Sequence, residues 1–230
     1  YVSLAPLLLL RRANVSTKKT KKSHVENDDD TAEKIAVAAT QLFAEKGYDG
    51  VSTKEICDLA KVNISGLHYH FETKEKLFLH IFEGQAERFL ETLKPLMSVP
   101  DTIEETRIRL EIFVEGVFDF YTKNRDISRI IQQENWLDTA RSQEIFDMFN
   151  PLIKHIHNFF IELQKKKFIQ KELSPDILTT IFLRFLRPHF DTLNAKKKAC
   201  IKVDFEKPDD LSRFTKQFVH VFLNGISKKD

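Results

Sequence analysis

Residues 52–76 read STKEICDLAKVNISGLHYHFETKEK, and this stretch decides the fold. Ser52 and Glu55 have the spacing of a capping box, so we expect a short helix to begin there. Asn63 is a suitable cap for a second short helix, and Thr73 is a suitable cap for a longer third one. Two short helices joined by a turn of about three residues and followed at once by another helix have the layout of a helix-turn-helix.

A helix-turn-helix requires an apolar seam between its helices. Residues at helical spacing are expected to form it: Ile56, Leu59, Ala60, Val62, Leu67 and Phe71. The second helix of such a motif turns its leading residues toward base edges in the major groove of DNA. Asn63, Ser65 and His68 are expected on this outer face, while the helix starts at Thr53 and Lys74 offer N–H groups that suit phosphates.

The sequence on both sides is expected to be helical as well. Asp30 and Glu33 form another capping-box pair ahead of an apolar stripe, and Gly47 is expected to end that helix. Further along, Pro151 predicts a kink or a break inside one helix, and Ser174 followed by proline predicts the start of another. Three later stripes are expected to face a core: Ile108, Ile112, Phe113, Val117 and Phe120; Ile177, Ile181, Phe185 and Leu186; Leu211, Phe214, Phe218, Val221 and Phe222.

These patterns predict an all-α chain of two domains. We assign residues 31–82 to a three-helix DNA-binding domain and residues 83–230 to a larger C-terminal helical domain. Residues 1–30 are expected to be a disordered arm, because its part from residue 13 onward holds clustered lysines and aspartates and almost no large apolar residues. Such an arm is either a solvated tail or a basic segment that reaches along the DNA.

Composition limits the classes of protein but does not itself indicate DNA. The 230-residue chain has a formal net charge of +2, so any basic surface must be local. Its content of 42% hydrophobic and 30% charged residues is that of a globular protein. Cys57 and Cys200 form neither a metal-site spacing nor a disulfide framework, and we expect both to be reduced in a cytoplasmic protein. The apolar run Leu7–Leu10 is far shorter than the roughly 20 residues that span a bilayer, so no membrane association is expected.

A longer pattern of residue types surrounds the helix-turn-helix. It consists of LFAEKGY at 42–48, Thr53 and Ile56 three residues apart, AKVN at 60–63, LHYHF at 67–71 and TKEKL at 73–77. In residue type and spacing this pattern resembles the DNA-binding domain of the TetR family of bacterial transcription regulators. The resemblance implies a sequence-specific DNA-binding regulator.

The resemblance also implies roles for individual residues. Thr53 and Lys54 would contact phosphates from the first helix of the motif. The family's base-reading positions are occupied by Ile64, Ser65, Gly66 and His68, and its phosphate-clamping positions by Tyr69, His70 and Lys74. The family commonly has a small hydroxyl residue where this chain has Gly66, and a tyrosine where it has His68. Either fewer bases are read directly here, or a thymine methyl approaches the bare backbone of Gly66.

For residues 83–230 the resemblance implies a domain that dimerises and binds an effector. A homodimer would form chiefly through two long helices, at about 174–194 and 209–226, and would read a palindromic operator. A small molecule bound in this domain would release the protein, as a repressor, from its operator.

The phenylalanines suggest where such a molecule would bind. Of the 20 phenylalanines, 16 follow residue 82, and they either line a pocket for a small apolar or aromatic effector or form an ordinary core. The candidate ligand-binding residues are Phe113, Phe120, Trp136, Phe149, Phe159 and Phe182. Residues 132–135, beside Trp136, either orient a ligand or form a solvated turn, and we favour the turn.

No catalytic signature, phosphate-binding loop or cofactor motif is found in the sequence, so we expect neither an enzyme nor a cofactor. Residues two apart do not share a helix face, so no metal site is expected at His68 and His70 or at the similar pair at 155 and 157. A metal site assembled across helices from His155, His189 and His220 stays an open alternative.

Two other functions compete with the effector-released repressor. One is a DNA-binding or architectural regulator without an effector, whose C-terminal domain would be tightly filled. The other is a helical protein that binds small molecules and carries a vestigial DNA-binding motif.

Overall fold

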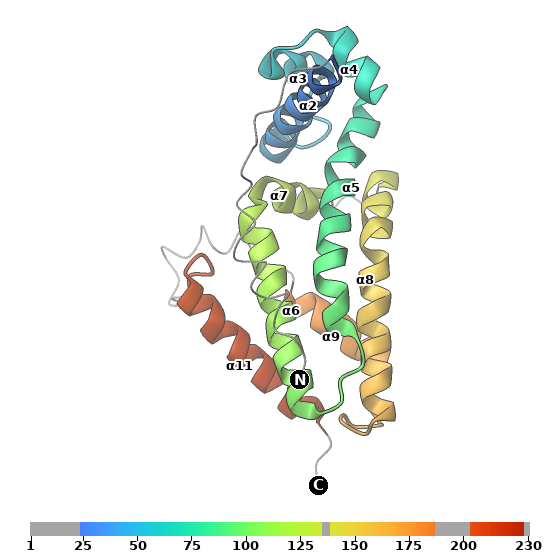
Figure 1. Ribbon diagram of the computed structural model, residues 1–230, viewed down its shortest axis with the longest axis vertical. Helices are drawn as coiled ribbons and strands as arrows, with labels where there is room; N and C mark the ends of the chain where they lie inside the picture. Colours follow the sequence, from blue (N-terminus) through green and yellow to red (C-terminus); the bar gives the residue numbers. More distant parts are fainter. Residues whose placement is uncertain (1–23, 135–138, 187–202, 228–230) are drawn as a thin grey trace.

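The computed structural model is built from helices, and it describes residues 24–134, 139–186 and 203–227 (Figure 1). The elements in these ranges are α2 (His24–Lys46), α3 (Thr53–Ala60), α4 (Ile64–Phe71), α5 (Lys74–Leu93), the 3-10 turn η1 (Lys94–Met97), α6 (Ile103–Lys123), α7 (Arg125–Glu134), α8 (Ala140–Lys165), α9 (Pro175–Leu186) and α11 (Pro208–Ile226). An isolated antiparallel bridge joins Ile169 to Ser227. The predicted all-α class is confirmed for these residues.

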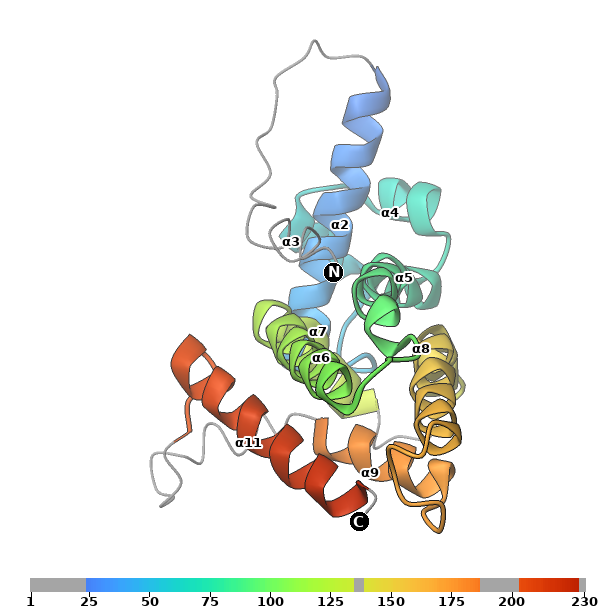
Figure 2. The same cartoon turned by 60° about the horizontal axis from the view of Figure 1, so that its bottom comes forward.

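The helices form an elongated molecule with the helix-turn-helix at one end. Figure 1 shows α2, α3 and α4 at the top, and α5 leads from them along the molecule beside α6 and α8. In Figure 2 the pair α9 and α11 lies on the side away from α2, with α5, α6, α7 and α8 between them. The helix α5 therefore connects the two ends of the molecule.

The three predicted caps of the helix-turn-helix region are confirmed. The hydroxyl of Ser52 accepts from the N–H of Glu55 at 3.2 Å, and the Glu55 carboxylate accepts from the N–H of Ser52 at 2.9 Å. The Asn63 side-chain oxygen accepts from the N–H of Gly66 at 2.7 Å, and the Thr73 hydroxyl accepts from the third residue of α5 at 3.1 Å. Each contact satisfies a backbone N–H that has no partner inside its own helix.

Two local predictions in this region were wrong. The helix α2 begins at His24, so Asp30 lies within it and is not its cap; the Asp30 carboxylate instead pairs with Lys34 one turn later. Leu59 was expected in the seam, yet 44% of it is exposed. The inward face of α3 runs through Ile56 and Cys57, and Leu59 falls to one side of that face.

Apolar side chains form two cores, and one of them includes residues from both sides of residue 82. One core lies in the body of the molecule and joins α5, α6, α8, α9 and α11. The other joins α2–α4 and the first half of α5, and it includes Ile127 and Ile130 from α7 and Ile145 from α8. The helix-turn-helix end is thus packed directly on two helices of the C-terminal part.

The buried face of α6 agrees only in part with the apolar stripe predicted for this helix. Its end at Asn124 agrees with the prediction, and Phe113 is buried as expected. Ile108 is 50% exposed, because the inward face runs through Thr106 and Leu110 instead.

The later helices agree with the predicted starts, but their apolar stripes do not all face the core. The helix α8 continues through Pro151 without a break, and α9 starts at Pro175 as expected. In α9 the residues Leu178, Thr179, Phe182 and Leu186 face inward, so the stripe predicted for it was placed on the wrong face except at Leu186. The side chains that this leaves exposed on α9 and α11 are Ile177 (60%), Ile181 (40%), Phe185 (62%) and Val221 (71%).

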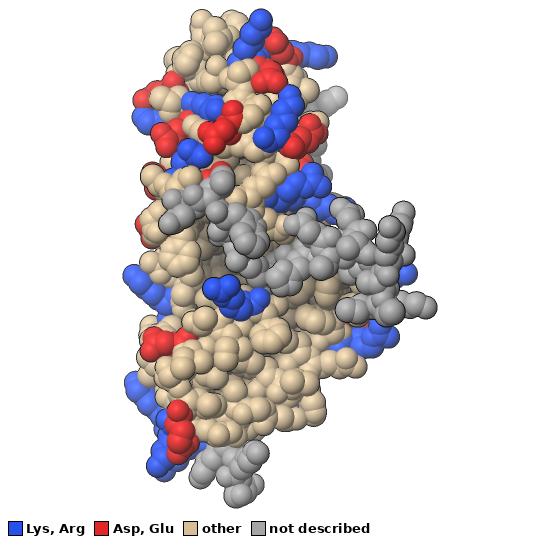
Figure 3. Space-filling view, turned by 180° about the vertical axis from the view of Figure 1, so that it is seen from behind, with Lys and Arg blue, Asp and Glu red and all other residues tan. Residues whose placement is uncertain are grey.

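The helices α9 and α11 lie where the surface of the molecule carries few charges. Seen from behind in Figure 3, the lower half of the molecule, where α9 and α11 lie, is largely uncharged, whereas side chains of both signs crowd the end that carries the helix-turn-helix.

Several predictions fall outside the described residues. These are the N-terminal arm up to residue 23, Trp136, His189, Cys200 and the extension of α9 to residue 194. Among the helices that are described, none combines the length and the apolar character needed to cross a membrane.

Candidate nucleic-acid interface and effector pocket

The second helix of the motif, α4, presents a polar and aromatic face to solvent. Leu67 and Phe71 are buried beneath it, as predicted. Ser65 and His68 are exposed, Ile64 is 48% exposed and Tyr69 is 73% exposed. Residues 64–70 thus leave the first turns of the helix open to a partner, which is the geometry that a major-groove contact requires.

The imidazole of His68 is held by its own helix end. Its Nδ1 lies 2.8 Å from the carbonyl oxygen of Glu72. Because a carbonyl oxygen only accepts, Nδ1 must carry the hydrogen, and Nε2 is the nitrogen left to meet a base. Glu72 has φ 59° and ψ −55°, a left-handed φ that turns the chain sharply from α4 into α5. His68 therefore supports this turn as well as the exposed face.

Asn63 and Gly66 are linked, and the link restricts both of them. The oxygen that Asn63 could offer to a base already accepts from the Gly66 N–H. A Cβ on residue 66 would stand 3.3 Å from that same oxygen, which is tighter than an ordinary contact. Gly66 therefore leaves room for the capping side chain, and the Asn63 amide nitrogen takes no part in this contact.

The first helix of the motif, α3, carries an exposed lysine and a glutamate that forms an ion pair with α2. Lys54 is exposed and Thr53 is half-buried at the helix start. Glu55 forms an ion pair of 2.7 Å with Lys46 at the end of α2. The hydrogen bond from Lys46, and then those from Ser52, lower the pKa of Glu55 to about 2. This ion pair joins the start of α3 to the end of α2.

Lys74 points into the protein and not toward solvent. Its ammonium donates to the carbonyl oxygens of Tyr48 at 3.0 Å and Val51 at 2.9 Å, and it lies 4.0 Å from the centre of the Tyr48 ring. In this arrangement the ammonium anchors the loop between α2 and α3. What the start of α5 can offer to a phosphate is its main-chain N–H groups. His70 is half-buried, and its ring lies 5.0 Å from that of Tyr69.

Tyr48 is a contact point that sequence reasoning missed. A second cation, the guanidinium of Arg141 at the start of α8, lies 3.8 Å from the centre of its ring. Burial raises the pKa of Tyr48, and the positive charge of Arg141 acts in the opposite direction. Nothing in the sequence near Arg141 marks it, because the contact joins residues far apart in the chain. We call the contact of Arg141, Tyr48 and Lys74 the tyrosine joint.

Near the tyrosine joint, two buried side-chain atoms of α7 and α8 make no hydrogen bond. Arg141 lies 3.8 Å from the carboxylate of Glu134 and 3.9 Å from that of Asp49, distances that are long for hydrogen bonds. Its buried Nε makes no hydrogen bond, and neither does the buried Oε1 of Gln133, whose Nε2 donates to the carbonyl of Ala44 at 3.2 Å. Residues 132–134 are helical and Glu134 is 3% exposed, so the expected solvated turn was wrong there.

A cavity of about 490 Å³ lies among α5, α6, α7, α8 and α9. Aromatic side chains supply much of its wall: Phe89, Phe113, Phe120, Tyr121, Phe146 and Phe149. Three of the candidate ligand-binding residues, Phe113, Phe120 and Phe149, are therefore at the cavity, while Phe159 and Phe182 are buried in the surrounding core. Glu134 and Arg184 are the charged residues of the wall.

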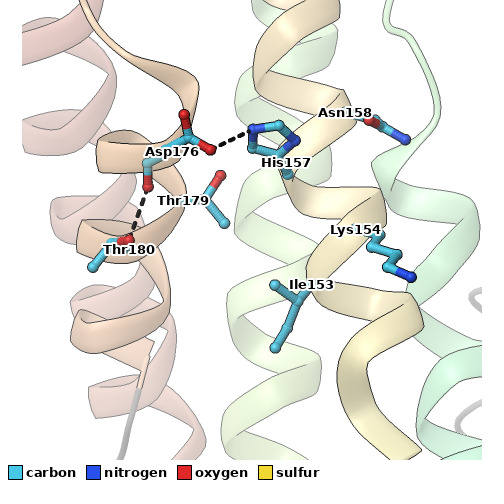
Figure 4. Close-up of a pocket in the computed structure, with 7 residues that line it drawn as sticks. All are labelled: Ile153, Lys154, His157, Asn158, Asp176, Thr179 and Thr180. Atoms are coloured by element: carbon cyan, nitrogen blue, oxygen red, sulfur yellow. Dashed lines mark hydrogen bonds and ion pairs between the residues drawn. The ribbon is translucent and has the colours of Figure 1, made fainter. Parts of the chain in front are cut away.

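A second hollow of about 430 Å³ lies between α8 and α9 (Figure 4). The His157 ring lies 3.1 Å from the Asp176 carboxylate across it, and Thr180 donates to the carbonyl oxygen of Asp176. Lys154 and Asn158 point away from α9 in Figure 4. Its polar groups are thus engaged with each other or turned aside. Across the described residues, no three His, Cys, Asp or Glu side chains come together in a way that could hold a metal ion.

Comparison with known proteins adds to this geometry. Residues 35–81, which contain the second half of α2, all of α3 and α4, and the start of α5, match the family described as bacterial regulatory proteins, tetR family. These residues form a DNA-binding domain of the TetR family.

Sequence relatives and solved structures extend the similarity beyond this domain. The probable HTH-type transcriptional regulator YttP of Bacillus subtilis is 28% identical over 137 residues, which cover 60% of this chain and 66% of that protein. A putative fatty acid metabolism regulator of Clostridium perfringens is 22% identical with a TM-score of 0.68, covering 85% of this chain and 100% of that one. FadR of Bacillus subtilis, in complex with stearoyl-CoA, is 16% identical with a TM-score of 0.65, covering 84% and 98%.

At these identities the two solved structures show a common fold. The chain spans between about half and two thirds of the length of the curated relatives that it matches first.

Proposed function

We propose that this protein is a DNA-binding transcriptional regulator that binds a palindromic operator as a homodimer, and that a small molecule in its cavity releases it. The observation that carries the proposal is the exposed outer face of α4, a helix that Asn63 caps and that Leu67 and Phe71 hold to the core. Ile64, Ser65 and His68 are the side chains proposed to meet base edges. Lys54, Tyr69 and the N–H groups that start α5 are proposed to hold the phosphates.

The apolar face of α9 and α11 supports the homodimer. Ile177, Ile181 and Phe185 lie one helical turn apart on α9 and are exposed, and the ring of Phe185 lies 5.8 Å from that of Phe218 on α11. A contiguous apolar face of this kind is unusual on a monomer. A two-fold pairing of these helices would bury it and place two α4 helices on one duplex.

The cavity supports an effector over a regulator that works without one. About 490 Å³ is the size of a small-molecule site, whereas a domain without an effector would be expected to fill that space. One neighbour in fold binds stearoyl-CoA, which shows that this architecture can hold an amphiphile. An effector would act by preferring one separation of the two α4 helices, and α5 lines the cavity through Phe89 while it carries α4 at its other end.

A gel shift with duplex DNA from upstream of the protein's own coding region tests the function. We expect specific binding that weakens as salt rises, because phosphate contacts release counterions. The variant Lys54→Ala should reduce the slope of log affinity against log salt by about one. Lys171→Ala is the matched control, since Lys171 is also exposed but lies at the opposite end of the molecule, and it should leave the slope unchanged.

Absence of any salt-sensitive, sequence-specific complex would favour the helical small-molecule-binding protein with a vestigial motif. Equal operator affinity with and without every molecule that binds the cavity would favour the regulator without an effector.

A further inference from the structure

The cavity wall carries a buried carboxylate at its edge toward the helix-turn-helix. Glu134 is the last residue of α7, its residue exposure is 3%, and it lines the cavity beside aromatic rings. The Thr139 hydroxyl donates to its Oε2 at 3.2 Å. A buried carboxylate is costly unless a positive group balances it, so the position of the nearest cation matters.

That cation does not line the cavity. Arg141 is 3.8 Å from Oε2 of Glu134, its Nε makes no hydrogen bond, and its guanidinium lies over the ring of Tyr48. Arg141 is not part of the cavity wall, whereas Glu134 is. The other charged residue of the wall, Arg184, is exposed and therefore screened by solvent. A bound molecule would thus meet one buried negative charge whose partner lies outside the cavity wall, 3.8 Å from the carboxylate.

We propose that the cavity binds an apolar amine, with its ammonium group against Glu134 and its apolar body among the aromatic side chains. Phe89 supplies the centre of that aromatic wall, with its ring 4.5 Å from Phe120 and 6.0 Å from Phe149. Ring faces attract cations, and the rings also cover an alkyl or aryl body. An amphiphile with a carboxylate head would instead place like charges together at Glu134.

The same geometry connects the cavity to the DNA-binding end. An ammonium group at Glu134 competes with Arg141 for the carboxylate, and Arg141 is one of the two cations on Tyr48. Lys74, the other cation, is the first residue of α5 and directly follows the turn out of α4. Occupancy of the cavity therefore changes the tyrosine joint, which sets the position of α4. This part of the inference rests on the proposed regulator function.

Isothermal titration of the full chain with decylamine, decanol and decanoate, each below its micelle concentration, tests the ligand class. These probes share one apolar chain and differ in the charge of the head. We expect decylamine to bind at least about tenfold more tightly than either of the others. Equal or tighter binding of decanoate, or no binding of decylamine, would overturn the proposal.

Variants locate the charge that produces this preference. Glu134→Gln should remove the preference for decylamine and leave decanol binding within about twofold of wild type. Glu134→Asp keeps the carboxylate and should retain part of the preference, which separates a charge effect from a folding defect. Glu144→Gln is the matched control, because Glu144 is exposed on α8 and is not part of the cavity wall; it should bind all three probes as wild type does. An unchanged preference in Glu134→Gln would overturn the assignment.

The connection to DNA is tested with Arg141→Met, which keeps much of the side-chain length without the charge. In wild type, decylamine should change operator affinity by about fivefold or more. In Arg141→Met, decylamine should still bind while operator affinity no longer responds to it. A full response in this variant would overturn the connection. Because the titrations contain no DNA, failure of the ligand class is distinguished from failure of the regulator function, which would appear as loss of operator binding by the unliganded protein.

Discussion

Tyr48 is the residue whose removal should reveal most about how the helix-turn-helix is held. Its ring lies 5.0 Å from that of Phe78 and 5.7 Å from that of Phe43, and the two cations of the tyrosine joint lie over it. The substitution Tyr48→Ala removes all four contacts at once. The phenol is only half-buried, so its contacts and not the burial of area dominate the expected loss.

The size of this loss follows from the contacts. Aromatic pairs contribute about 0.5–1.5 kcal/mol each beyond the burial of area. A cation over a partly exposed ring contributes about 0.5–1 kcal/mol. The four contacts together predict that Tyr48→Ala lowers the free energy of unfolding by about 3 kcal/mol. For a chain of this size that corresponds to a fall in Tm of roughly 6–12 °C.

Thermal unfolding followed by far-ultraviolet circular dichroism measures this directly. Tyr48→Phe is the control, because it keeps the ring and should move Tm by about 2 °C or less. If Tyr48→Ala and Tyr48→Phe both keep a Tm close to that of wild type, the ring does not hold the joint, and the reasoning that connects Arg141 to α5 is refuted. If both variants melt early by the same amount, the phenol hydroxyl and not the ring is responsible.

Three further substitutions test separate parts of the structure by the same measurement. Gly116→Ala should destabilise the protein by up to about 2 kcal/mol, because its Cβ would lie 2.6 Å from the buried Leu93 side chain at a cost of about 1–3 kcal/mol, while the better helix propensity of alanine offsets about 1 kcal/mol; a raised Tm would mean that α5 and α6 are less closely packed. Glu55 has a folded-state pKa of about 2 against an ordinary 4.5, so its stabilising pair with Lys46 is complete above pH 4.5 and is lost as the pH falls toward 2. Glu55→Gln should therefore be less stable than wild type at pH 7 and converge with it at low pH, whereas a difference that does not depend on pH would argue against the pair. Lys61 has φ 57° and ψ 43° between α3 and α4, so Lys61→Gly should relieve strain and raise stability by up to about 1 kcal/mol, and a fall in Tm would contradict this.

The sequence predicted the helix-turn-helix well because its signals are local. A capping residue and the N–H group that it accepts from are three residues apart, so Ser52, Asn63 and Thr73 could be recognised from spacing alone. The same holds for the start of α9 at Pro175 and the end of α6 at Asn124. In these cases one short window of sequence contains every atom that the geometry needs.

The sequence failed where the direction of a side chain depends on distant packing. Leu59 and Ile108 have helical spacing but lie beside the buried face, and the pattern alone does not define the centre of that face. The resemblance places Lys74 at a phosphate-binding position, which stays a prediction, but it gave no sign that the ammonium would lie against two carbonyl oxygens and a ring. The contact of Arg141 with Tyr48 depends on how α8 packs on the helix-turn-helix end, and no local window of sequence contains that information.

The central claim is that the open face of α4 reads base pairs, and selection of bound duplexes from a randomised pool tests it most directly. Wild type should select two inverted half-sites whose centres are about one helical turn, or a multiple of it, apart. His68→Ala should keep that spacing and relax the preference at one position of each half-site, at a cost of about 1–3 kcal/mol there. A wild-type pool without enrichment, or a His68→Ala pool with the same preferred bases as wild type, would contradict the account.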